Sequence, residues 1–335
     1  MNKGAILVTG GAGYVGSHTL RELLERDEKV VVLDDLSEGH AVAAGGAVIV
    51  QANLAESGTV GELVEIFARE RFEAVFHFGA KAYVGESVED PGKYYRNNVV
   101  GGINLLSAMA SAGVTAIIFS STCATYGIPQ IVPISEEHPQ NPINPYGWTK
   151  LVFEQALKDF ERAHGIRHIN LRYFNAAGAH ERGDLGEDHR PETHLIPLAC
   201  EAAMGRGAEL SVFGNDYDTP DGTCIRDYIH VQDLAVAHVK ALERLRASGP
   251  STNYNLGTGH GHSVQEVIVA VEDVSGRRVA REIGPRRPGD PPRLVASAQR
   301  ALGELEWAPR LGNLHRIVET AWQFKERFPD GYPND

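Results

Sequence analysis

Cysteine is scarce in this sequence, whose 335 residues include only Cys123, Cys200 and Cys224. Because their number is odd and no two are spaced as Cys-x-x-Cys, they exclude a metal site built from cysteines and are typical of a reducing compartment. Histidine is more frequent, with 14 residues, but no His-Glu-x-x-His arrangement occurs. We therefore expect no metal in the functional site.

Long apolar runs and an excess of positive charge are missing as well. No run approaches the roughly 20 residues of a membrane-spanning helix, and the N-terminus leads directly into an apolar strand without a signal-peptide pattern. The formal net charge of −12 argues against nucleic acid or an anionic membrane as a partner. These absences predict a cytoplasmic protein, and its length is sufficient for a large core and two lobes.

A glycine cluster follows the first apolar run of the chain. Ala5–Thr9 is predicted to be a buried parallel strand, and Gly10, Gly13 and Gly16 lie in the turn that leads into a helix. Such glycines permit a tight turn, a close approach of the backbone to a pyrophosphate, and close helix–strand packing. No Gly-Lys-Ser/Thr ending follows, which excludes the phosphate loop of an ATPase.

An acidic residue completes this pattern. Asp34 ends a second apolar run, residues 30–33, about 20 positions after Gly13. A carboxylate there can accept hydrogen bonds from the adenosine ribose and would repel a 2′-phosphate, so the sequence favours NAD over NADP as the cofactor.

Strands and helices alternate through the first half of the chain, which predicts an α/β fold with a doubly wound parallel sheet (Rossmann). After about residue 175 the sequence becomes rich in turns, and we expect a smaller mixed α/β substrate-binding lobe. The predicted NAD-binding domain is 1–175 and the mainly substrate-binding lobe 176–335. Helices near 231–246 and 311–325 are expected to pack back on the sheet. Further strands are predicted at 47–50, 74–77, 115–120 and 169–173, and helices at 57–70, 91–112 and 146–164.

A tyrosine and a lysine lie four residues apart where a helix is predicted to begin. Asn144 is a good N-cap and Pro145 suits the first helical position, so Tyr146 and Lys150 share one helix face. A nearby cation and the positive helix end both lower the pKa of a phenol, which would make Tyr146 a general base. By itself such a pair is more often part of an amphipathic surface, but the glycine turn gives it a cofactor context.

Together these motifs resemble the extended short-chain dehydrogenase/reductase family, within which several runs are similar to UDP-glucose 4-epimerases (NAD-dependent epimerase/dehydratase). The similarity extends over essentially the whole chain. The runs are Ser120-Ser121-Thr122, Val84-Gly85-Glu86-Ser87-Val88, Leu171-Arg172-Tyr173-Phe174-Asn175, Phe213-Gly214-Asn215-Asp216-Tyr217, Arg226-Asp227-Tyr228-Ile229-His230, Tyr254-Asn255-Leu256-Gly257 and Arg286-Arg287-Pro288-Gly289-Asp290.

The resemblance implies a redox-neutral cycle on a UDP-sugar. Tyr146 would take the proton of the sugar 4-hydroxyl while hydride passes to NAD, and the 4-keto sugar would turn over before hydride returns to its other face. Lys150 would hold the nicotinamide ribose, and Thr122 would donate a hydrogen bond to the reacting oxygen. The family also implies a homodimer through the helices at 91–112 and 146–164.

The same resemblance implies two sets of binding residues. The cofactor set is Gly10, Gly13, Tyr14, Val15, Gly16, Asp34, Asn53, Leu54, Phe78, Ala80, Asn97, Ser120, Tyr146, Lys150 and Tyr173. The substrate set is Thr122, Tyr146, Asn175, His194, Leu195, Phe213, Arg226, Tyr228, Arg287, Asp290 and Leu294. Arg226 and Arg287 are the expected diphosphate contacts, since a guanidinium binds phosphate oxygens in pairs.

Three positions depart from the pattern of the family. Asn53 replaces an Asp near the adenine amino group, although its carbonyl can still accept that hydrogen bond. Thr193-His194-Leu195 replaces Asn-Asn-Leu at the pocket edge. Leu294 stands where relatives have Tyr or a small residue, and its intermediate size predicts some turnover of UDP-N-acetylglucosamine.

Three functions compete with 4-epimerisation of a UDP-hexose. A 4,6-dehydratase needs an acid pair after Thr122, where this chain has Cys123-Ala124. A UDP-pentose (arabinose or xylose) 4-epimerase stays open, because the missing hydroxymethyl group is discriminated by only a few kcal/mol. A non-catalytic NAD sensor or scaffold would have lost Tyr146, Lys150 or the glycines, all of which are present.

Overall fold

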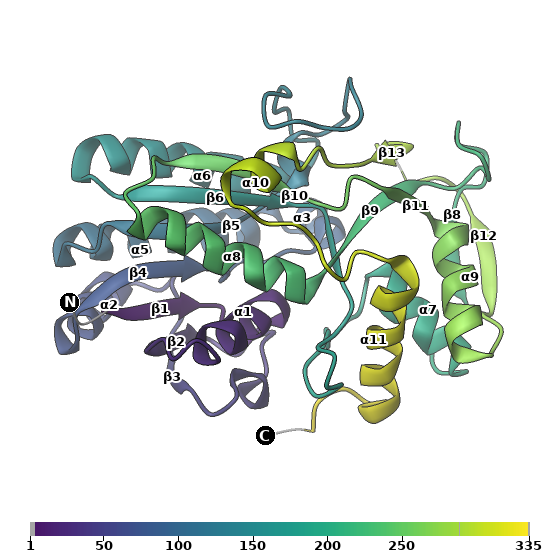
Figure 1. Ribbon diagram of the computed structural model, residues 1–335, viewed down its shortest axis with the longest axis horizontal. Coiled ribbons are helices and arrows are strands. Elements are labelled where there is room, and N and C mark those ends of the chain that lie inside the picture. Colours follow the sequence, from purple (N-terminus) through teal and green to yellow (C-terminus); the bar gives the residue numbers. More distant parts are fainter. Residues whose placement is uncertain (1–3, 288, 334–335) are drawn as a thin grey trace. The chain divides into compact units, whose positions relative to one another are not determined.

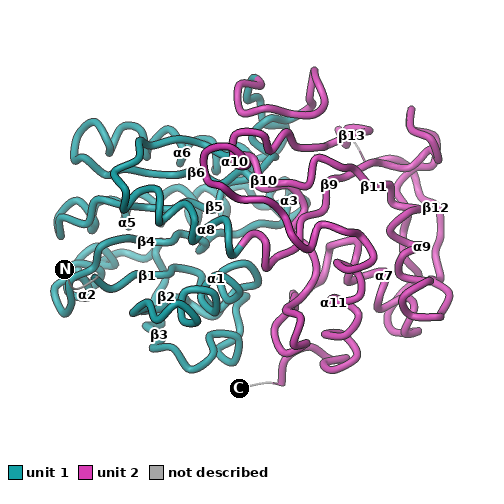
Figure 2. Tube along the Cα trace, viewed as in Figure 1, with its two compact units in different colours: residues 1–127, 139–172, 235–254 teal, residues 128–138, 173–234, 255–335 magenta. Residues whose placement is uncertain are grey.

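The computed structural model describes residues 4–287 and 289–333, which form two compact units (Figure 2). Unit 1 consists of residues 1–127, 139–172 and 235–254, and unit 2 of residues 128–138, 173–234 and 255–335. The outer ends of both predicted domains, and Pro288 of the Arg-Arg-Pro-Gly-Asp run, lie outside the described residues.

Unit 1 is built on a seven-stranded sheet with the strand order β10-β6-β5-β4-β1-β2-β3 (Figure 1). The pairings of β1 with β2 and β4, of β2 with β3, and of β4 with β5 are all parallel. Reversal of the strand order on either side of β1 is characteristic of a doubly wound sheet. The strands are β1 (Ala5–Thr9), β2 (Val30–Asp34), β3 (Val48–Gln51), β4 (Phe72–His77), β5 (Ala116–Thr122), β6 (Arg167–Tyr173) and β10 (Thr252–Leu256).

The core of unit 1 explains why these strands read as continuous apolar runs. Leu7, Val75 and Ile117 of three adjacent strands are fully buried, because helices cover the sheet. Leu63 of α2 (Thr59–Arg69), Leu105 of α5 (Gly101–Ala112) and Phe153 of α6 (Pro145–His164) belong to the same cluster. The predicted fold class is therefore confirmed.

The helix expected at 91–112 is not one regular helix. It begins as α4 (Pro91–Tyr94), whose N-cap Asp90 accepts a bond from the Lys93 N–H, and continues as a π-helical turn, Tyr95–Val100, before α5. A short helix, α3 (Val84–Glu89), precedes it. Single π turns are rare and often mark functional sites, and this one contains Asn97.

Unit 2 contains two smaller sheets. β9 (Ile225–His230) lies between β11 (Gly261–Ser263) and β13 (Arg293–Leu294) and also pairs with β7 (Asn175–Ala177). β8 (Leu210–Phe213) and β12 (Arg281–Gly284) form a parallel pair. Helices α7 (Leu195–Ala203), α9 (Val264–Ser275) and α11 (Leu314–Arg327) pack together, with Cys200, Ile268 and Val318 in their common core.

The two helices expected near 231–246 and 311–325 to pack on the first sheet belong mainly to different units. Most of α8 (Val231–Arg246) belongs to unit 1, whereas α11 contacts α7 and α9 in unit 2. The other described α-helices are α1 (Tyr14–Leu24) and α10 (Gln299–Glu304), and short 3₁₀ helices lie at Ala41–Ala44 and Cys123–Thr125. Within residues 4–287 and 289–333, no helix is both long and apolar enough to cross a membrane.

Candidate active site

The glycine turn between β1 and α1 is closely packed against itself. Gly10 has φ +71°, a conformation that side chains rarely adopt, and a Cβ at Gly16 would lie 2.1 Å from the Gly10 carbonyl oxygen. Among the residues that the structure describes, a Cβ at Gly13 would meet only that same oxygen, at 3.5 Å, which is an ordinary contact. Contacts within the chain therefore require glycine at positions 10 and 16, whereas glycine at 13 fits the close approach of a ligand.

The N-terminus of α1 has the features of an anion site. Gly13 is its N-cap, with extended backbone and no side chain to cap the first N–H groups. The helix begins with Tyr14 and Val15, both half-buried. Uncapped N–H groups and the positive end of a helix dipole favour a phosphate at this position, which fits the pyrophosphate of NAD.

Asp34 is tied to the glycine turn by its own carboxylate. One oxygen accepts a bond from the Ala12 N–H at 2.9 Å and the other from the Leu36 N–H at 2.9 Å. Burial raises the pKa of this carboxyl, and the two backbone bonds oppose that shift. Since each carboxylate oxygen has two lone pairs, these bonds leave capacity for ribose hydroxyls.

Asn53 follows β3 and is held by two hydrogen bonds. Its amide donates to Asp35 at 3.1 Å and its carbonyl accepts from the Ala55 N–H at 2.8 Å. The second lone pair of the carbonyl is the acceptor expected for adenine from the sequence. Leu54, the next residue, is buried and lies close to Gly101 of α5.

Further predicted cofactor residues lie after β4 and in the π turn. Phe78 packs against His238 with ring centroids 4.7 Å apart, and Ala80 lies two residues farther on, half-buried. Asn97 donates to Asn98 at 3.1 Å. Asn98 was not predicted from the sequence, yet it bonds the Lys81 backbone and the Thr149 hydroxyl and so joins the π turn to α6.

The start of α6 positions the tyrosine and the lysine as the sequence predicts. Asn144 accepts a bond from the Gly147 N–H at 2.8 Å, and Pro145 occupies the first turn. Lys150 Nζ lies 5.8 Å from the centroid of the Tyr146 ring, which is half-buried. The two side chains therefore share one face of the first turns of α6, with the cation beneath the phenol ring.

Lys150 is an unusual cation because it is buried and bonds a neutral group. Its Nζ donates to the Ser120 carbonyl oxygen at 2.8 Å and lies over the Phe119 ring. Burial lowers the pKa of Lys150 to about 7, and Glu154 only partly offsets this shift. The Lys150 side chain can thus exchange between ammonium and neutral amine near neutral pH, which suits a group that acts beside a base.

Thr122 ends β5 and caps the short helical turn that follows it. Its hydroxyl oxygen accepts from the Ala124 N–H at 3.2 Å. A Cβ at Gly147 would lie 2.6 Å from the Ala124 carbonyl oxygen, so glycine lets α6 approach this turn closely. Thr122, Tyr146 and Lys150 therefore belong to two contacting segments of unit 1.

A buried ion pair supports the same strand end, and it was not predicted from the sequence. Glu154 accepts from Arg172 through both carboxylate oxygens, at 2.9 and 2.5 Å, and from the Ser121 hydroxyl at 2.6 Å. Arg172 also donates to the Tyr126 hydroxyl at 3.0 Å. Although burial opposes it, the bonds and charge of Arg172 lower the pKa of Glu154.

In unit 2, Arg226 and Asp290 form a pair within the predicted substrate set. Arg226 Nη2 lies 2.5 Å from Asp290 Oδ1, and the side chain of Arg226 is only 13% exposed. Leu294 is the register partner of Arg226, from β13 to β9. Farther along β9, Asn175 of β7 pairs with Tyr228, and its amide donates to the Asp227 carbonyl at 3.0 Å. Five predicted substrate residues are thus brought together around one strand.

An arginine and an aromatic ring form a second group in unit 2. The Arg287 guanidinium lies 3.9 Å from the centroid of the Phe213 ring, and both residues are exposed. Such a stacked pair presents a flat apolar surface beside a positive charge, which suits a nucleotide base and a phosphate.

Tyr173, from the predicted cofactor set, is the last residue of β6 and is half-buried.

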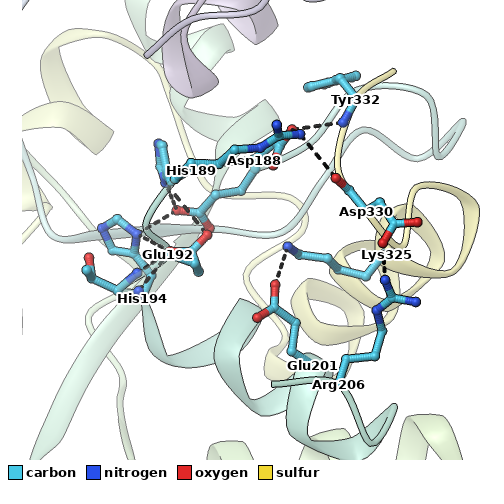
Figure 3. A network of polar contacts seen from close by, with 12 residues as sticks. Asp188, His189, Glu192, His194, Glu201, Arg206, Lys325, Asp330 and Tyr332 are labelled. Carbon is cyan, nitrogen blue, oxygen red and sulfur yellow. Dashed lines mark hydrogen bonds and ion pairs between the residues drawn. The ribbon is translucent and has the colours of Figure 1, made fainter. Parts of the chain in front are cut away.

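His194 lies between two carboxylates at the N-cap of α7, which begins at Leu195 (Figure 3). Its Nδ1 is 2.9 Å from Glu187 Oε1 and 2.9 Å from Glu192 Oε1. Neither glutamate was among the predicted site residues. Their spacing with His189 and His194, Glu-x-His-x-x-Glu-x-His, is readable from the sequence and is the signal that was overlooked.

Comparison with a family model, with known sequences and with solved structures finds epimerases in each case. The model of the NAD dependent epimerase/dehydratase family matches residues 6–257. A UDP-glucose 4-epimerase of Halalkalibacterium halodurans is 48% identical over 331 residues, 99% of this chain and 98% of that protein. The structure of UDP-glucose 4-epimerase from Brucella ovis in complex with NAD is 49% identical, with a TM-score of 0.92, covering 96% of this chain and 98% of that one.

A third similar protein was solved with both kinds of ligand. It is UDP-glucose-4-epimerase from Stenotrophomonas maltophila with bound NAD and formylated UDP-arabinopyranose. It is 40% identical to this chain, with a TM-score of 0.92, and the match covers 98% of this chain and 99% of that one.

Proposed function

The chain belongs to the NAD-dependent epimerase/dehydratase family, and from this premise we propose that it interconverts UDP-glucose and UDP-galactose by inverting carbon 4. It is an isomerase that depends on NAD, and a transient 4-keto sugar makes the cycle redox-neutral. A 4,6-dehydratase lacks support, since no acid pair directly follows Thr122. A non-catalytic sensor lacks support as well, since Tyr146, Lys150 and the glycines are all present.

The chemistry is proposed for three residues of unit 1. NAD, when bound, accepts the hydride of carbon 4 and returns it. Tyr146 removes the proton of the 4-hydroxyl and later restores it, and Thr122 donates a hydrogen bond to the same oxygen as charge develops on it. Lys150 stabilises the tyrosinate by its charge and holds the nicotinamide ribose through the same ammonium.

Recognition of the UDP portion is proposed for unit 2. Arg226 and Arg287 bind the diphosphate, since guanidinium groups match phosphate oxygens, and Phe213 covers the uracil. Asn175 and Asp290 contact the diphosphate or the uridine ribose. His194, Leu195, Tyr228 and Leu294 complete the proposed substrate surface.

One observation carries the catalytic assignment. Lys150 is buried, donates to the Ser120 carbonyl rather than to a carboxylate, and lies beside the ring of Tyr146 at the positive end of α6. A structural lysine would be paired with a carboxylate or reach solvent, because an uncompensated buried ammonium is costly. Stabilisation of a Tyr146 phenolate during catalysis would explain why the chain tolerates the unfavourable burial of the Lys150 ammonium.

A UDP-pentose 4-epimerase is the second candidate. The similar protein from Stenotrophomonas maltophila was solved with a formylated UDP-arabinopyranose, so the fold accommodates a pentose in that relative. The experiment incubates the protein with UDP-glucose, UDP-galactose, UDP-xylose, UDP-arabinose and the N-acetylhexosamine counterparts, without added reductant. Hexose interconversion without accumulating NADH supports the proposal. Stoichiometric NADH would identify a dehydrogenase, and turnover of pentoses alone would identify the second candidate.

The division of labour and the assembly are also proposed. Residues 1–175 form the NAD-binding domain and residues 176–335 mainly the UDP-sugar lobe, in a cytoplasmic homodimer joined through α5 and α6 with their preceding turns. Tyr95, Val100, Trp148 and Val152 support this interface, since each is more than a third exposed despite its apolar character. Light scattering at micromolar concentration is expected to give a dimer, and a monomer would contradict the proposed assembly.

A further inference from the structure

The loop that precedes α7 brings two imidazoles and two carboxylates together within unit 2. Glu187, His189, Glu192 and His194 each offer one donor atom, and these four atoms all lie within 4.8 Å of one another. Figure 3 labels His189, Glu192 and His194 of this cluster. We propose that this cluster is a structural zinc site, with the Nδ1 atoms of both histidines and one oxygen of each glutamate as its four ligands.

The distances match the edges of a small coordination tetrahedron. Glu187 Oε1 lies 2.9 Å from His194 Nδ1 and 3.2 Å from His189 Nδ1. Glu192 approaches His194 Nδ1 through Oε1 at 2.9 Å and His189 Nδ1 through its other oxygen, Oε2, at 3.7 Å. Bonds of about 2.0–2.2 Å to a tetrahedral zinc place neighbouring ligand atoms about 3.3 Å apart. Small side-chain adjustments therefore bring these atoms to bonding distance of one ion.

The donor set selects the kind of metal. Calcium and magnesium prefer oxygen ligands alone, whereas imidazole with carboxylate suits zinc and its transition-metal neighbours. All three cysteines lie elsewhere in the chain, so thiolate does not compete for the ion. Four protein ligands fill the tetrahedron, as in structural zinc sites, and leave no position for a reacting water.

Charge also fits a divalent ion. The side chains of both glutamates are only 6% exposed, and buried carboxylates need compensating positive charge. Protonation of both imidazoles would supply a charge of about +2, and one zinc ion would supply the same charge. The two arrangements differ in composition, so measurement distinguishes them directly.

The surroundings hold the ligands in place. The Glu192 carboxylate accepts bonds from the backbone N–H groups of Thr193 and His194, at 2.8 and 2.9 Å. Between the first two ligands, Asp188 Oδ2 accepts from the Tyr332 N–H at 2.8 Å, which ties the loop to the C-terminal segment. These bonds orient a ligand and limit the freedom of the loop, as outer contacts do around known zinc ions.

The inferred role is to fix the beginning of α7. His194 is the N-cap of this helix, and Leu195 is its first residue. Zinc bound to Nδ1 leaves the Nε2–H of His194 on the far side of the ring from the ion, and 44% of this side chain is exposed. A metal outside the proposed reaction would thus order one edge of the proposed substrate surface. This role rests on the proposed function, whereas the zinc site itself does not.

The test measures metal in the full chain purified without a histidine tag. After equilibration in a buffer that fixes free zinc in the nanomolar range, elemental analysis is expected to give about one zinc per chain, and X-ray absorption to give N/O ligands at about 2.0–2.1 Å. Removing the zinc with dipicolinate should lower the melting temperature, and zinc alone should restore it. Absence of bound zinc, or a melting temperature indifferent to both treatments, overturns the proposal.

Variants locate the ion. His189→Gln and Glu192→Gln should each lose the zinc, whereas His315→Gln, which removes an exposed histidine paired with Asp273 in the same unit, should keep it. If one ligand variant fails to fold, the other and the wild-type chelation experiment still decide the matter. Retention of stoichiometric zinc by both ligand variants places the metal elsewhere and overturns the site.

Discussion

Arg172 and Glu154 form a two-pronged ion pair inside unit 1, with separations of 2.9 and 2.5 Å between their nitrogen and oxygen atoms. Both residues are fully or almost fully buried, and Glu154 lies one turn of α6 after Lys150. The same carboxylate holds the hydroxyl of Ser121, next to Thr122. The pair therefore connects the helix that carries the proposed base to the strand end that carries its hydrogen-bond donor.

Breaking this pair should cost much more than breaking one on the surface. Glu154→Gln leaves the Arg172 guanidinium buried without its counter-charge, and we expect unfolding by urea to show a loss of about 3–5 kcal/mol. The double variant Glu154→Gln/Arg172→Met should recover part of that loss, because the buried Arg172 charge is then removed together with its partner. Arg162→Ala is the control, since its pair with Asp159 is exposed and worth less than about 1 kcal/mol. Equal losses for Glu154→Gln and Arg162→Ala would contradict this account.

Two glycines of the same turn should respond differently to alanine. At Gly16 the new Cβ collides with the Gly10 carbonyl oxygen at 2.1 Å, so Gly16→Ala is expected to destabilise the fold by about 1–3 kcal/mol. At Gly13 the Cβ makes an ordinary contact at 3.5 Å, so Gly13→Ala should change stability by less than about 1 kcal/mol.

Cofactor binding should separate these two variants further. The methyl group of Gly13→Ala stands where we propose that the backbone approaches the pyrophosphate, and we expect calorimetry to show a large loss of NAD affinity in a folded protein. Wild-type NAD affinity in Gly13→Ala would show that the turn does not bind the pyrophosphate as proposed.

The sequence predicts this part of the molecule well because its signals are local. The glycine turn, Asp34 and the capped start of α6 depend on residues close together in the chain, and the structure gives each of them the expected position. The partner of Glu154 is not predictable in this way. Arg172 lies 18 residues away on a strand, and its pairing depends on how α6 packs on the sheet.

The pKa of Lys150 gives unfolding a specific dependence on pH. Burial lowers this pKa from its ordinary value of 10.5 to about 7 in the folded protein. Between these values the unfolded chain binds the proton more tightly, so the contribution of Lys150 to stability increases with pH by up to about 1.4 kcal/mol per pH unit. Below pH 7 both states are protonated, and the full cost of burying the charge is present.

Comparison with Lys150→Met isolates this contribution. The difference in unfolding free energy between wild type and variant, measured without NAD from pH 7 to 9, should shift in favour of the wild type as the pH rises. Most other titrating groups are common to both proteins and cancel. A difference that is flat across this range would show that Lys150 keeps its ordinary pKa in the folded state.

The size of residue 294 should control the acceptance of N-acetylated sugars. Leu294 pairs with Arg226 in register, next to the proposed diphosphate contact. Leu294→Cys removes bulk and is expected to raise kcat/KM for UDP-N-acetylglucosamine by about 10- to 200-fold, with little change for UDP-glucose. The wild type should show some turnover of the N-acetylated sugar. An unchanged ratio of the two kcat/KM values in the variant would exclude Leu294 as the residue that sets the preference.

The site in unit 2 shows where sequence reasoning reaches its limit. Arg226, Asp290 and Leu294 are separated by up to about 70 residues, and only the pairing of β9 with β13 brings them together. Resemblance to a family indicated these residues, because no local pattern links them. The Glu187–His194 loop is the opposite case, since its four side chains lie within one short segment and their spacing alone could have drawn attention to a metal.

Replacement of Tyr146 by phenylalanine tests the central claim most directly. Tyr146→Phe keeps the ring beside Lys150 and removes only the hydroxyl that is proposed to move the proton. Assayed with UDP-galactose as substrate and with NAD binding measured in parallel, the variant should bind NAD normally while its kcat falls by about 10²–10⁴-fold. Near-normal formation of UDP-glucose by this variant would contradict the account, because proton transfer would then not depend on Tyr146.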